Sequence, residues 1–187
     1  LTKADLSLAD LSDADFGKAT LTGATLTNAI LTGADFTDTS LTNGILKSVD
    51  MTNSIFKKAR LTGADLEEAD LTAADLSTAD LVNAKLTQVN STGTNFTGAT
   101  MIRADLEGAI MIGTILTNAN LSAANLSGAD LTGANLMGAD LTKAQLVDTN
   151  LTGVIMSTAS IIGVVWEGTT CPDGTSSSDH GDTCADN

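Results

Sequence analysis

The chain has 187 residues, enough for one domain of ordinary size, and its 23 acidic against 9 basic residues give a formal net charge of −14. This charge disfavours direct binding to nucleic acids, because basic patches supply most of the affinity for phosphates. No run approaches the ~20 apolar residues that span a bilayer, so we expect no membrane insertion. Aromatic residues make up only 3% of the chain, and such a composition indicates internal repeats.

A large apolar residue recurs every five positions from the start of the chain. Thirty-three of the 34 positions spaced by five from Leu1 to Trp166 hold Leu, Ile, Met, Phe or Trp, and the exception is Ser91. On an α-helix, steps of five rotate a residue by roughly 140°, which spreads these side chains around all sides. On a strand, an odd step alternates the faces. The apolar residues share one core only if the chain turns once per five residues, so four turns close a square coil.

The repeated unit has the form Ala-(Asp/Asn)-Leu-(Thr/Ser)-x, as in residues 64–68 and 129–133. This unit, repeated over residues 1–168, resembles the pentapeptide-repeat family. The resemblance implies an all-β, right-handed quadrilateral β-helix with about eight coils of about 20 residues. We therefore expect a β-helix domain over 1–168 and an irregular C-terminal tail over 169–187.

The corners of the square fall two positions after each central residue. Many of these positions hold Gly or Asn, such as Gly23 and Asn28, which suits a type II turn with a positive φ. Other corners hold Lys18, Asp38 or Lys143, for which we expect turns without that requirement. The sequence thus predicts two kinds of corner.

The two ends of a solenoid need covers, because each coil buries its core only against its neighbours. At the C-terminal end Trp166 holds the last inward position and is predicted to cap the open coil. At the N-terminal end no cap is visible, so either it was removed or another chain covers the first coil.

The tail contains both cysteines, Cys171 and Cys184. In an oxidising compartment this pair predicts a disulfide, worth roughly 3 kcal/mol for a loop of this size. Redox or metal chemistry is the alternative, but no partner His or Cys supports it. The tail is similar to those of secreted or lumenal cyanobacterial-type members of the family, which favours the periplasm, the thylakoid lumen or the exterior.

Catalysis is not expected, since a narrow Leu/Ala interior leaves no cleft in which a nucleophile and a base converge. The one histidine, His180, lies in the tail. It could form a weak cation site with Asp173, but the spacing matches no known loop motif, and we favour a solvated loop. We predict no catalytic residue, cofactor or metal.

The outer faces are therefore the candidate functional surface. Four isoleucines interrupt the polar ladders, and acidic residues line the same faces; the candidate residues are Ile110, Ile112, Ile115, Ile155, Asp50 and Asp70. The predicted function is a rigid, non-catalytic scaffold that binds an unidentified protein, with end-to-end or face-to-face self-association as a further expectation. The first alternative is duplex mimicry, since the resemblance includes modulators of type II topoisomerases such as gyrase. The second is ice binding through the Thr ladder.

Overall fold

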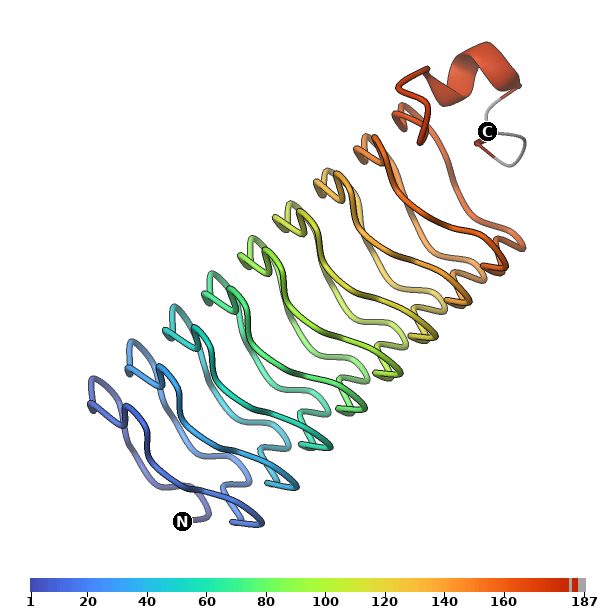
Figure 1. The fold of residues 1–187 in the computed structure, drawn as a ribbon. Helices are drawn as coiled ribbons and strands as arrows, with labels where there is room; N and C mark the ends of the chain where they lie inside the picture. The colour runs from blue at the N-terminus through green and yellow to red at the C-terminus, as the bar shows by residue number, and fades with distance from the viewer. Residues whose placement is uncertain (182, 185–187) are drawn as a thin grey trace.

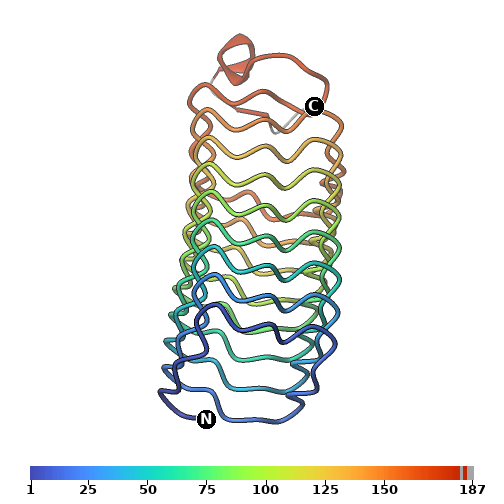
Figure 2. The ribbon, with the colours of Figure 1, turned by 90° about the vertical axis from the view of Figure 1, so that its left-hand side faces the viewer.

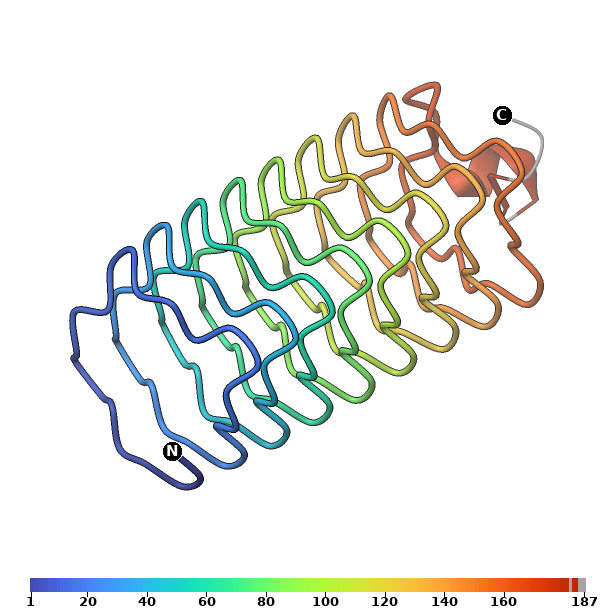
Figure 3. The same ribbon diagram turned by 60° about the horizontal axis from the view of Figure 1, so that its bottom comes forward.

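The structure, a computed structural model, describes residues 1–181 and 183–184 and is a solenoid of stacked coils (Figures 1 and 2). Parallel β-bridges join residues 20 positions apart, such as Asp10 with Ile30. Four ladders of such bridges run along the molecule, and we name the four sides of the coil after their first residues: the Asp5, Asp10, Asp15 and Thr20 sides. This arrangement agrees with the predicted four-sided coil, and Figure 3 shows the coils one behind another.

Backbone hydrogen bonds within and between coils hold each five-residue unit. In the unit centred on Leu26, the N–H groups of Leu26 and Asn28 donate to the next coil at 2.7 and 3.0 Å. The N–H of Thr25 donates to the previous coil at 2.9 Å, and the N–H of Ala29 closes the corner on the Leu26 carbonyl at 2.9 Å. Four of the five N–H groups are thereby paired with backbone, and only the group that follows the central residue is left.

The interior is a continuous column of central residues and alanines. From Leu21 to Leu151 every central residue is at most 1% exposed. Phe36 stacks on Phe16 and Phe56 with ring centroids 4.7 and 4.5 Å apart. Where a hydroxyl replaces the inward alanine, it donates to a backbone carbonyl inside the column; these residues are Thr39, Ser54, Thr94, Thr114, Thr149 and Thr169.

All corners share one backbone conformation, so the prediction of two kinds of corner is wrong. Lys18, Asp38 and Lys143 have φ values of 62°, 57° and 61°, like the glycines at equivalent positions. Each corner has the positive φ at its third residue only, which defines a type II turn. The left-handed region is unfavourable for a residue with a Cβ by about 1–2 kcal/mol. Hydrogen bonds to the next coil, such as Lys18 N–H to Thr37 O at 2.8 Å, impose it nevertheless.

The coil register runs one unit further than the sequence pattern suggested. Thr170 still forms a parallel bridge to Asn150, and Cys171 occupies an inward position with no exposed surface. The chain then reverses: Ser176 pairs antiparallel with Thr170, and a 3-10 helix, η1 (Ser177–His180), follows. This segment is drawn in red beyond the last coil in Figure 1. The tail expected over 169–187 is thus described except at 182 and 185–187.

Candidate functional site

Asp or Asn precedes many of the central residues, and in most of these units its side chain closes the hydrogen bonding of the following corner. Asp70 Oδ1 accepts the backbone N–H of Thr72 at 2.9 Å and its hydroxyl at 2.5 Å. This is an Asx-turn, and it satisfies the fifth N–H of the unit. The same pair of bonds recurs at Asp5, Asp10, Asp50, Asn90, Asn95, Asn120, Asp130 and Asn150. Sequence reasoning missed this structural role, although the Asx-x-Ser/Thr spacing signals it.

These bonds also set the acidity of the outer faces. The hydroxyl and the N–H of Ser7 lower the pKa of Asp5, and Ser12 lowers the pKa of Asp10 in the same way. At Asp50, burial acts to raise the pKa, but the bonds from Thr52 and Thr32 outweigh it and the pKa is lowered. At these three residues the turn lowers the pKa because its hydrogen bonds favour the charged form of the carboxylate.

The Thr ladder beside the Asp10 side is bonded to the protein itself. The hydroxyls of Thr52, Thr72 and Thr132 each donate to the carboxylate two residues earlier, at 2.5 to 2.8 Å. The hydroxyl of Thr32 lies 3.2 Å from Asp50 Oδ2 and donates to it. These donors face carboxylates on the same surface, which disfavours a regular array of free hydroxyls that could order ice.

The candidate apolar residues gather on two adjacent sides. Ile110 lies on the Asp10 side and Ile115 on the Asp15 side, with Ile112 at the corner between them. Ile155 is joined to Ile115 through one intervening residue of the same ladder, and is 54% exposed. Ladder spacing places the two about 10 Å apart along the rod. The structure thus brings the four isoleucines into one region.

The acidic candidates lie on the same rod but further toward the N-terminus. Asp50 and Asp70 are bridged neighbours on the Asp10 side, and Asn90 separates Asp70 from Ile110. Both carboxylates serve the Asx-turns described above. They therefore flank the isoleucines without joining them.

Two lysines of the N-terminal half, Lys47 and Lys57, form local ion pairs. Lys47 Nζ lies 2.5 Å from Glu67 and 3.3 Å from Asp65, and these hydrogen bonds raise the pKa of Lys47. Lys57 Nζ lies 3.1 Å from Asp75 on the opposite part of the coil. The cations offset neighbouring acidic coils and form no basic stripe.

The tail is tied to the last coil at several points. Cys171 and Cys184 form a disulfide with their Cα atoms 5.3 Å apart, and both residues are buried. Ser177 donates its hydroxyl to the Trp166 carbonyl at 2.5 Å and its N–H to the Thr169 carbonyl at 2.8 Å. Trp166 is 6% exposed beneath this segment.

His180 and Asp173 both contact Thr175. The Thr175 hydroxyl lies 2.9 Å from His180 Nε2 and donates to Asp173 Oδ1 at 2.6 Å. Across the described residues no group of three or more His, Cys, Asp or Glu side chains is placed to hold a metal ion. The described part of the chain also contains no helix of the length and apolarity that crossing a membrane requires.

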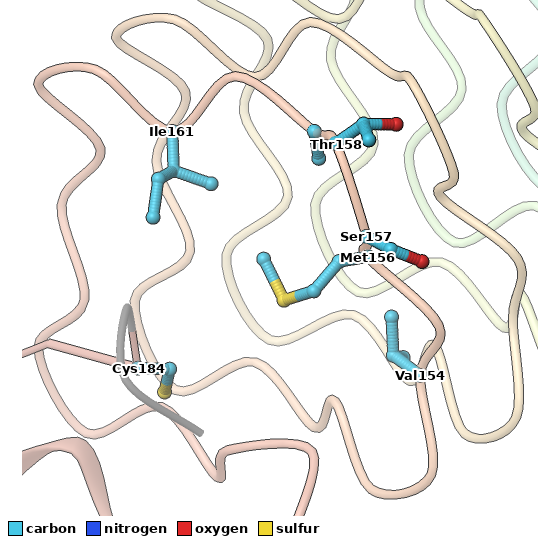
Figure 4. Close-up of a pocket in the computed structure, with 7 residues that line it drawn as sticks. Val154, Met156, Ser157, Thr158, Ile161 and Cys184 are labelled. Carbon is cyan, nitrogen blue, oxygen red and sulfur yellow. The ribbon is translucent and has the colours of Figure 1, made fainter.

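Two hollows mark the surface. One, of about 440 Å³, opens at the C-terminal end and is lined by Val154, Met156, Ser157, Thr158, Ala159, Ile161 and Cys184 (Figure 4). The other, of about 290 Å³, is a groove on the side of the rod beside Glu67 and Glu107. Among the described residues, neither lining contains a histidine beside a hydroxyl or thiol group.

Comparison with known families identifies the repeat. A family model described as pentapeptide repeats matches the chain in eight copies, over residues 4–43, 21–57, 45–81, 79–118 and 119–157. The chain belongs to the pentapeptide-repeat family. Membership confirms the resemblance and implies a right-handed quadrilateral β-helix, of which the four ladders are the sides.

Solved pentapeptide-repeat structures are similar along much of the chain. HetL, involved in heterocyst differentiation regulation in the cyanobacterium Nostoc sp. strain PCC 7120, is 33% identical over 93% of this chain and 85% of HetL, with a TM-score of 0.43. A thylakoid lumen protein of Arabidopsis thaliana is 31% identical over 59% of this chain and 70% of that protein, with a TM-score of 0.28. QnrB1, a plasmid-mediated fluoroquinolone resistance protein, is 19% identical over 90% of this chain and 92% of QnrB1, with a TM-score of 0.46. A search of curated proteins finds no match.

One apolar residue of this pentapeptide-repeat protein escaped the sequence reasoning. Met137 is 45% exposed and lies two residues after Asn135, which bridges Ile115 and Ile155. It takes the position that Ser or Thr holds in most units. A large apolar residue at that position is the signal that finds it.

Proposed function

We propose that this pentapeptide-repeat protein is a non-catalytic rod that binds another protein through its side. The binding surface, which we call the lateral patch, consists of Ile110, Ile112, Ile115, Met137 and Ile155. All five are exposed apolar side chains within three consecutive coils on adjoining sides. A contiguous apolar patch rimmed by polar residues is typical of a protein interface.

The observation that carries the proposal is that three units of the lateral patch lack the Asp or Asn that closes the corner in many other units. At Ile110, Ile115 and Ile155 an isoleucine replaces the Asp or Asn that would close the next corner. Among the described residues, the backbone N–H groups two positions later accordingly have no protein acceptor. Each such bond contributes about 0.5–1.5 kcal/mol. Ile30, Ile45 and Ile55 also stand where Asp or Asn would close a corner. The isoleucines of the lateral patch differ from them because they gather with Ile112 and Met137 into one exposed group, and we propose that a partner covers this group.

The rod is also suited to an oxidising compartment. The buried Cys171–Cys184 disulfide ties the tail to the last coil, and disulfides persist mainly in exported proteins. We therefore propose that the protein works in the periplasm, the thylakoid lumen or the exterior.

Duplex mimicry is the alternative function, based on the net charge of −14 and the rod shape. The acidic groups lie on all four sides, and many of them serve Asx-turns. A supercoiling assay separates the two functions: the proposed one gives no inhibition of gyrase at micromolar protein, and inhibition would favour mimicry.

To test the lateral patch, two of its isoleucines are replaced by Asn, which closes the corner in other units. The variant Ile110→Asn/Ile115→Asn supplies the missing turn acceptors and removes apolar surface, so we expect it to fold at least as stably as the parent while losing the partner. The matched control, Ile30→Asn/Ile55→Asn, makes the same change outside the patch. Proteins captured from the exported fraction of the source organism are compared by mass spectrometry. A partner retained equally by all three forms would refute the lateral patch.

A further inference from the structure

The described part of the tail covers only about half of the last coil. The tail lies over Trp166 and Thr169, to which Ser177 is bonded. The chain leaves the coil before it reaches the Asp15 and Thr20 sides again, where the next coil would have stacked on Met156 and Ile161. The resulting pocket is the space that two central residues of a further coil would fill, as Figure 4 shows from the side chains around it.

The backbone around this pocket is an open sheet edge. In the coil beneath, the N–H groups of Leu136, Gly138 and Leu141 donate to the next coil at 2.7, 3.1 and 2.8 Å. The equivalent groups of the last coil make no hydrogen bond among the described residues; they are the N–H groups of Met156, Thr158, Ile161 and Gly163. Unpaired edges of this kind accept an added strand.

The outer rim of the same edge is unusually apolar. Ile162 is 72% exposed and Val165 is 45% exposed. In most other coils the equivalent outward positions hold Thr, Ser, Asp or Asn. A pocket lined in part by Met156 and Ile161, free backbone donors and an apolar rim therefore coincide at one place.

We propose that this open half-coil binds an extended segment of another protein, which adds to the edge as a strand and inserts large apolar side chains over Met156 and Ile161. The interface continues the one that joins every pair of coils in the molecule. The same rule then sets the partner's chemistry: a large apolar residue preceded two positions earlier by a small one. The proposal concerns a different surface from the lateral patch and does not rest on it.

A thin segment fits this end better than a second copy of the rod. The segment carrying η1 projects beyond the last coil, as Figures 1 and 2 show. It therefore obstructs a flat contact between two rod ends. A strand can lie beside it and still reach the pocket.

The test uses a capped peptide with the sequence of residues 134–141, ANLMGADL, which occupies the equivalent sides of an inner coil. The protein is labelled with ¹³C at the methionine methyl groups, and the Met156 signal is assigned with Met156→Leu. We expect the peptide at millimolar concentration to shift the Met156 methyl signal and leave that of Met137 unchanged. Replacing both peptide leucines by Asp should weaken binding at least about tenfold, because apolar burial is lost.

Two protein variants check the location. Ala159→Phe fills the pocket and should abolish the shift, while Ile162→Asp alters only the exposed rim and should weaken it. Trp166 fluorescence verifies that each variant keeps its cap.

An unmoved Met156 signal, or equal binding of the Asp peptide, would overturn the proposal. A concentration-dependent dimer that shifts Met156 without peptide would also overturn it, by making a second copy the occupant. Ile110→Asn/Ile115→Asn should still bind the peptide, which separates this test from that of the lateral patch.

Discussion

Removal of the disulfide should release the C-terminal cap while the coils stay wound. The cross-link joins residues 13 positions apart, which in the chain-entropy model corresponds to about 3 kcal/mol. The other ties of the cap are the bond from the Ser177 hydroxyl to the Trp166 carbonyl and the two backbone bonds of the Thr170–Ser176 bridge. The bridge bonds run from Ser177 N–H to Thr169 O and from Cys171 N–H to Thr175 O, and each of the three bonds is worth about 1 kcal/mol net. In the double variant Cys171→Ala/Cys184→Ala, we expect the free energy of cap release to fall by about 3 kcal/mol, roughly half of what holds the cap.

Trp166 reports on the cap because it is the one tryptophan of the chain and lies buried beneath the tail. In the disulfide-bonded protein, urea should change Trp166 fluorescence and the circular dichroism of the coils together. In the double variant, the fluorescence should change at a lower urea concentration than the circular dichroism. Nearest-neighbour stability in solenoids allows such separate melting of an end.

The single variant Cys184→Ala separates the cross-link from packing. It leaves the Cys171 side chain in the core and removes only the bond, so it should melt like the double variant. Thiol alkylation without reductant should leave the parent mass unchanged. Two alkylated thiols in the parent, or coincident transitions in the double variant, would refute the reasoning.

Three further predictions concern the coils. Asp130→Ala should destabilise the protein by about 1–2 kcal/mol in urea unfolding, because the N–H and hydroxyl of Thr132 lose their acceptor. The control Asp130→Asn keeps an acceptor oxygen. An equal loss of stability in both variants would contradict the role of Asp130 in the Asx-turn. Phe36→Ala should destabilise by about 3–5 kcal/mol and Phe36→Leu by less than ~1.5, because Leu76 fills the same column. Acid should lower the free energy of unfolding, because several Asp carboxyl groups have a lower pKa in the folded chain than in the unfolded chain. Their contribution to stability is fully present above the unfolded pKa of about 3.9 and is lost as the pH falls through the folded pKa values. Unchanged urea midpoints between neutral and strongly acidic pH would oppose this prediction, which rests on Asp5, Asp10, Asp35, Asp50, Asp75 and Asp140.

The four-sided coil was predictable because a large apolar residue recurs at almost every fifth position of the sequence. A turn at every fifth residue brings the central residues into one column, and the bridges between residues 20 apart show that four such turns close each coil. The corners were not predictable from residue type. Lys18 and Lys143 adopt a positive φ because hydrogen bonds to the neighbouring coil demand it, and these bonds join segments about 20 residues apart. Residue preference at a corner is weaker than this non-local constraint.

The candidate site was predictable only as a set of exceptions. Ile110, Ile112, Ile115 and Ile155 stand out once the polar ladders are written side by side. Their cost to the fold was missed because the Asx-turn was not recognised, although the Asx-x-Ser/Thr spacing of the other units signals it. The pocket at the C-terminal end was hidden for another reason. Its existence depends on where the chain leaves the coil after Cys171, and no periodic signal marks that point.

We propose that stability and function compete at the lateral patch. Restoring Asn at 110, 115 and 155 adds three turn acceptors, a gain of about 1.5–4.5 kcal/mol if each bond contributes its usual share. The same change at Ile30 and Ile55 adds acceptors without touching the patch. If the isoleucines served only the fold, both sets of changes would be harmless to function. The proposed role instead requires that the first set stabilise the rod and disable it, while the second only stabilises it, as expected where local rules are broken at a functional site.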